Sequence, residues 1–66
     1  MSWWGVYCPN IDQYYAGNGT YVADFKYGCR YSSQQQAQQG ADSLNQQGYC
    51  QGMNRVLKFT PENSIY

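Results

Sequence analysis

The sequence contains no histidine, and only 12% of its 66 residues are charged. Without an imidazole, neither a Ser-His nor a Cys-His pair can be built, and the most common general base is missing. The carboxylates are spread along the chain rather than paired, at Asp12, Asp24, Asp42 and Glu62. We therefore expect no enzymatic activity and assign no catalytic residue.

Motifs for metals, cofactors and nucleic acids are also missing. The three cysteines include no C-x-x-C pair, and the AGNG segment lacks the spacing of a phosphate-binding loop. Four Lys and Arg balance four Asp and Glu, so no basic cluster is available to neutralise nucleic-acid phosphates. We expect no metal, no cofactor and no nucleic-acid partner, while a net charge of zero favours self-association or a partner-covered surface.

Long apolar runs are absent as well. No stretch approaches the roughly 20 apolar residues that cross a bilayer, so we expect no membrane span. The opening MSWWGVYCP lacks the basic segment and apolar core of a signal peptide. This leaves two alternatives: a cytoplasmic protein with free thiols, or a periplasmic or extracellular one that has lost a leader and carries a disulfide.

What the chain does contain is aromatic and amide side chains, including eight Tyr and two Trp. Its length suits one domain, residues 1–66, of the α+β class. A three-stranded antiparallel meander is expected at residues 3–7, 12–16 and 20–31, because Asn18-Gly19 is typical of a type I′ hairpin turn. Gly28 is expected at a bulge or bend of the long third strand. A short fourth strand in NRVLKFT completes the order β-β-β-α-β.

The segment YSSQQQAQQGADSLNQQGYC predicts the single helix. Ser32 or Ser33 is a suitable N-cap, and Gly48 falls where a left-handed C-terminal cap is expected. The apolar residues follow helical spacing on one narrow face, with Gly40 beside them: Ala37, Ala41 and Leu44. This small-residue face should pack on the sheet.

Alternation along residues 20–31 places one set of side chains on a single face: Tyr21, Ala23, Phe25, Tyr27, Cys29 and Tyr31. The helix should cover this face best from Phe25 to Cys29. The rings with least cover, and hence the candidate partner-binding surface, are Trp3, Trp4, Tyr14, Tyr15 and Tyr21. The alternative is that these rings complete a second small core with Ile65 and Tyr66.

The cysteines allow several pairings. In a meander the first and third strands run parallel, which brings Cys8 and Cys29 to the same end and favours a disulfide between them. Cys8 pairs with Cys50 instead if those strands are antiparallel, and three buried free thiols are a third alternative. A Cys29–Cys50 bridge is disfavoured because the helix carries the chain some 20 Å away.

Two segments resemble known families. KYGCRY is similar to the RNP1 strand of RNA-recognition domains, which would imply bases stacked on its aromatic rings. YSSQQQAQQGADSLNQQGY resembles the strand-helix half of SPOR-type peptidoglycan-binding domains, which implies an envelope role. The latter covers less than a third of the chain and the family's first helix is missing, so no binding residue carries over.

These observations predict a small non-catalytic binding module. The leading hypothesis is an inhibitor, adaptor or accessory protein, of phage or mobile-element type, that docks an aromatic surface on a larger protein. The alternatives are a structural subunit of a virion, filament or envelope assembly, and an envelope domain that binds peptidoglycan or another glycan.

Overall fold

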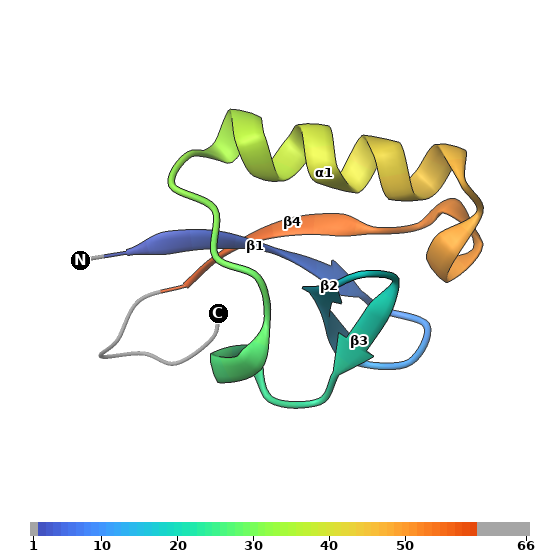
Figure 1. Ribbon diagram of the computed structural model, residues 1–66, viewed down its shortest axis with the longest axis horizontal. Coiled ribbons are helices and arrows are strands. Elements are labelled where there is room, and N and C mark those ends of the chain that lie inside the picture. Colours follow the sequence, from blue (N-terminus) through green and yellow to red (C-terminus); the bar gives the residue numbers. More distant parts are fainter. Residues whose placement is uncertain (1, 60–66) are drawn as a thin grey trace.

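The computed structural model describes residues 2–59, in which four strands form one antiparallel sheet with one long helix on it (Figure 1). The strands are β1 (Trp3–Cys8), β2 (Gln13–Gly17), β3 (Thr20–Val22) and β4 (Arg55–Phe59), and helix α1 spans Gln34–Gln46. Two 3-10 turns lie in the connections, η1 (Phe25–Tyr27) and η2 (Tyr49–Gly52). The expected order β-β-β-α-β is confirmed, and the spatial order β3-β2-β1-β4 places the last strand beside the first.

The hairpin between β2 and β3 forms where the sequence predicts it. Asn18 and Gly19 have φ of 55° and 76°, as the two central residues of a type I′ turn require. Gly17 also lies at positive φ, 98°, where the register shifts between Tyr15 and Gly17. The sequence therefore codes this turn locally, through residues that tolerate the left-handed region.

The third strand is much shorter than the expected residues 20–31, because it ends at Val22. Asp24 stops it: the side chain accepts a hydrogen bond from the Lys26 N–H at 2.9 Å and begins η1. Gly28 lies at a bend, as expected, but the bend closes η1 through a hydrogen bond from its N–H to the Phe25 carbonyl. The single face predicted for residues 21–31 is wrong, since alternation lasts only while the backbone stays extended.

Helix α1 begins and ends as predicted. The Ser33 hydroxyl accepts a hydrogen bond from the Gln36 N–H at 3.2 Å, and Gly48 follows the helix at φ 86°. The expected apolar face is buried: Ala37, Ala41 and Leu44. Figure 1 shows α1 lying along β1 and β4, so this face forms a core with Val6.

Small residues let the helix approach the aromatic rings, as expected. A Cβ added to Gly40 would lie 2.9 Å from the Tyr31 hydroxyl, so the glycine leaves room for this ring. Tyr31 reaches the helix side because its backbone bridges β1: the Trp4 N–H donates to the Tyr31 carbonyl at 2.9 Å, and the Tyr31 N–H to the Trp4 carbonyl at 2.8 Å.

The opposite face of the sheet carries a second core made of aromatic rings. The ring of Phe25 lies 5.3 Å from that of Phe59 and 6.3 Å from that of Trp3, between centroids, and Tyr14 lies 5.7 Å from Phe59. Phe59 is 2% exposed and Tyr14 is 7% exposed. Phe25 therefore does not lie beneath the helix, because η1 turns it onto this face. Ile65 and Tyr66, expected as possible members, lie outside the described residues.

Candidate functional site

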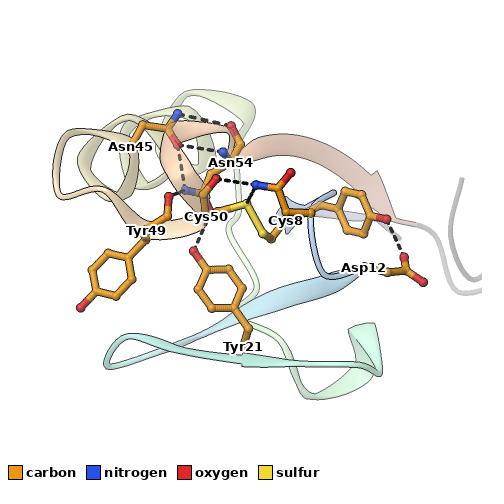
Figure 2. Close-up of a disulfide and its surroundings, with 9 residues drawn as sticks. Cys8, Asp12, Tyr21, Asn45, Tyr49, Cys50 and Asn54 are labelled. Atoms are coloured by element: carbon orange, nitrogen blue, oxygen red, sulfur yellow. Dashed lines mark hydrogen bonds between the residues drawn. A yellow bond between two sulfur atoms is a disulfide. The ribbon is translucent and has the colours of Figure 1, made fainter.

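A disulfide between Cys8 and Cys50 closes the end of the sheet where β1 stops (Figure 2). Their Cα atoms lie 5.8 Å apart. The expected Cys8–Cys29 pairing is wrong, and Cys29 is a free thiol whose backbone N–H donates to the Tyr15 carbonyl. The reason is topological. β4 begins shortly after Cys50 and pairs antiparallel with β1, which brings Cys50 to the end of β1 where Cys8 lies. β3 stops at Val22, so Cys29 is not part of a third strand that would bring it to the same end.

Exposed apolar side chains gather on the two segments that this disulfide joins. We call residues 9–12, together with η2 and Met53, the disulfide end. Ile11 is 54% exposed, Met53 is 45% exposed and Tyr49 is 37% exposed. Asp12 is the only charged residue in these segments. The disulfide end thus exposes three large apolar side chains beside polar ones such as Asn10 and Gln51, and it has a single charge. Charged residues are depleted at the centre of protein interfaces.

Hydrogen bonds hold these segments in place beside the disulfide. The Asn10 side chain donates to the Cys50 carbonyl at 2.9 Å, which ties the β1–β2 turn to η2. The Cys50 carbonyl also accepts from the Met53 N–H at 3.0 Å. The Tyr49 ring lies over the β2–β3 turn, since a Cβ added to Gly19 would meet its hydroxyl at 2.9 Å. η2 therefore contacts both the β1–β2 turn and the β2–β3 turn, which lie at opposite ends of β2.

A buried asparagine, Asn54, holds η2 in place through hydrogen bonds. Asn54 is 6% exposed, and its side-chain amide donates to Asn45 Oδ1 at 2.7 Å and to the Tyr49 carbonyl at 2.9 Å (Figure 2). Its Oδ1 accepts from the Tyr21 hydroxyl at 2.6 Å. Helix α1, η2 and β3 are joined through one side chain whose polar atoms are all paired. The sequence analysis missed this role, because the residues lie far apart and form no local motif.

The loops at this end also contain left-handed backbone at residues other than glycine. Among residues 2–59, four non-glycine residues have positive φ: Asp12, Asn18, Cys50 and Gln51. Each costs of order 1 kcal/mol relative to ordinary backbone. The disulfide and the hydrogen bonds of Asn10 and Asn54 hold the backbone in this conformation, which fixes the directions of the exposed side chains beside it.

The five rings predicted to bind a partner do not form one surface. Trp3 and Tyr14 belong to the second core, whereas the Trp4, Tyr15 and Tyr21 positions face the helix side. Tyr14 is buried and the other four are half-buried. Basic side chains lie over both tryptophans: Arg30 is 4.3 Å from the Trp3 ring centroid, and the Lys58 ammonium is 5.6 Å from that of Trp4. The exposed apolar residues of the disulfide end were missed because each stands alone in the sequence.

Titratable groups near the site are few. A hydrogen bond donated to Asp12 raises the pKa of the Tyr7 hydroxyl, and burial raises the pKa of the Cys29 thiol. Both groups therefore stay protonated at neutral pH. Within residues 2–59 no three His, Cys, Asp or Glu side chains lie close enough together to hold a metal ion.

Comparison of the chain with protein-family models, curated protein sequences and solved structures finds no match. Neither resemblance seen in the sequence gains support from these comparisons. The strand needed for the RNP1 likeness is absent, because Phe25–Tyr27 forms a 3-10 turn. No helix in the described part of the chain has the length and apolar character required to cross a membrane.

Proposed function

We propose that this chain is a non-catalytic module that binds another protein through the disulfide end. The observation that carries the proposal is the exposure of Ile11, Tyr49 and Met53 on two covalently joined segments with a single charge, Asp12. Tyrosine and methionine are enriched at interface centres, and charged residues are depleted there. The expected partner surface is apolar and weakly charged.

The rigidity of the disulfide end supports the same function. Binding costs roughly 0.5–1.5 kcal/mol for each mobile side chain that must be ordered, and loop ordering adds to this. Here the disulfide and the Asn10 and Asn54 contacts order the loops before binding. A small chain that presents a prearranged loop surface suits an inhibitor, adaptor or accessory subunit. The disulfide supports an oxidising compartment, periplasmic or extracellular, as the place of action.

The test begins with capture of a partner from the secreted or periplasmic fraction of the source cells on immobilised, oxidised protein. The dissociation constant of that partner is then measured for the wild type, for Ile11→Ser combined with Met53→Ser, and for Tyr27→Ser. Tyr27 is the matched control, because it is 74% exposed but lies in η1, outside the disulfide end. We expect at least about tenfold weaker binding for the double variant and less than about twofold change for the control.

A further variant separates this surface from the rings predicted by sequence. If Trp3→Ala weakens binding while the folded double variant binds normally, the contact surface lies at the tryptophans and the disulfide end is not the site. Circular dichroism of each variant verifies the fold, which matters most for Trp3 because its ring packs on Phe25. Reduction of the disulfide in the wild type should weaken binding as well, since it frees η2.

A further inference from the structure

Asn18 lies in the turn between β2 and β3, and its surroundings differ from those of the other asparagines in the described chain. Its side chain is exposed and precedes a glycine, and among residues 2–59 it makes no hydrogen bond. The side chains of Asn10, Asn45 and Asn54 are each hydrogen-bonded, and none of the three precedes a glycine. Asn18 therefore carries the least restrained amide group of the four.

An unrestrained asparagine side chain reacts with the backbone nitrogen that follows it. The Gly19 nitrogen attacks Cγ of Asn18 and a five-membered imide ring forms. The bond from Cγ to Nδ2 breaks, and Nδ2 leaves as ammonia together with the Gly19 amide proton. Water then opens the ring at Cγ to give aspartate, or at the backbone carbonyl to give isoaspartate, so that water replaces ammonia and no electrons are transferred. Glycine favours the attack because no Cβ hinders the approach of the two groups.

The hairpin gives the attacking nitrogen little protection. The Gly19 N–H donates to the Tyr15 hydroxyl at 3.3 Å, which is a long hydrogen bond. β3 has only 3 residues and lies at the edge of the sheet, and its register with β2 shifts between Tyr15 and Gly17 (Figure 1). Short edge elements of this kind open locally at a lower free energy than global unfolding requires. The turn can therefore reach the reactive geometry while the rest of the chain stays folded.

We infer that Asn18 is a modification site of this chain, at which the side-chain amide is lost to give aspartate and isoaspartate. Both products add a negative charge to a chain whose formal net charge is zero. Aspartate tolerates the φ of 55° at this position and keeps the turn. Isoaspartate lengthens the backbone by one carbon, which breaks the two-residue turn that matches the twist of the strands. The isoaspartate form should therefore also weaken the contact between the turn and the Tyr49 ring.

Incubation of the oxidised full chain in warm, mildly alkaline buffer, followed by mass spectrometry with fragmentation, tests the inference. We expect exchange of ammonia for water at Asn18 at least about tenfold faster than at Asn10, which is also exposed but is hydrogen-bonded. An isoaspartate methyltransferase should transfer methyl groups from S-adenosylmethionine to the incubated chain. Asn18→Gly is the matched control, because Gly-Gly suits a type I′ turn, and it should accept almost none. Equal rates at Asn10 and Asn18, or equal methylation of wild type and variant, would overturn the inference.

A second measurement uses only the wild type and asks whether the folded hairpin permits the reaction. The rate at Asn18 is compared between the folded, oxidised chain and the same chain reduced and unfolded in guanidinium chloride. Because only the hairpin has to open, the folded rate should lie within about a hundredfold of the unfolded rate. A larger ratio would mean that the turn protects Asn18 as strongly as the rest of the fold does, and this would also overturn the inference.

Discussion

Removal of the Cys8–Cys50 disulfide should cost more stability than any other single change in this chain. The bridge joins residues 42 apart in sequence, and a loop of that length contributes about 4 kcal/mol through the entropy of the unfolded chain. The clean perturbation is Cys50→Ser in a Cys29→Ser background, so that Cys8 has no other cysteine to pair with. Cys8, which is 1% exposed, keeps its packing in this variant.

The measured quantity is the free energy of unfolding from urea denaturation followed by tryptophan fluorescence. A chain of this size is expected to have a total stability of only about 3–10 kcal/mol, so a loss of about 4 kcal/mol removes a large share of it. The melting temperature should fall by more than about 15 °C. The control is Cys29→Ser alone, which keeps the disulfide and should change the free energy by less than about 1 kcal/mol.

Two results would refute this reasoning. One is a loss below about 1 kcal/mol in the Cys50→Ser variant, which would mean that the bridge does not restrict the unfolded chain as calculated. The other is a thiol titration of the denatured wild type that finds three free thiols instead of the one expected from Cys29. The second result would also remove the support for an oxidising compartment.

Three further changes test the packing and the titratable groups. Gly5→Ala should destabilise the protein by about 1–3 kcal/mol in urea denaturation, because the added Cβ would lie 2.4 Å from the Phe59 ring; an unchanged midpoint would mean that this ring is free to move. Asn54→Ala should cost about 2–4 kcal/mol, since three partners lose their hydrogen bonds to this buried side chain, whereas Asn10→Ala, at an exposed position, should cost about 1 kcal/mol or less. Burial raises the pKa of the Tyr31 hydroxyl above its unfolded value of about 10, so its contribution to stability is present below that pH and is lost as pH rises through the folded value. The urea midpoint should therefore fall as the pH rises above about 10, and Tyr31→Phe should reduce that fall; equal falls would contradict the assignment.

Features that depend on local chemistry could be predicted from the sequence. The Asn18-Gly19 turn, the Ser33 cap and the Gly48 end of α1 each depend on a few neighbouring residues with special backbone preferences. The buried face of α1 follows from helical spacing alone. The number and order of the main elements could be predicted for the same reason.

The errors arose where one local signal competed with another. Alternation from Thr20 to Tyr31 favours a long strand, yet Asp24 can accept a hydrogen bond two residues ahead and end the strand early. That turn moves Phe25 to the opposite face, where its ring packs on Phe59 and Tyr14, and this packing stabilises the turn in return. The sequence is compatible with both the long strand and the turn. Only the packing of Phe25 on Phe59 and Tyr14, which lie far away in the sequence, selects the turn.

The sequence by itself determined the turns, the helix, the class of fold and the absence of histidine chemistry, because each depends on residue type or on spacing within a few positions. Tertiary structure decided which cysteines pair, which rings share a core, and that the segments carrying Ile11, Tyr49 and Met53 are joined by one disulfide. These depend on β4 lying beside β1, a contact between residues about 50 positions apart in the chain. Such a contact is set by the total burial of the folded chain, which no short segment encodes.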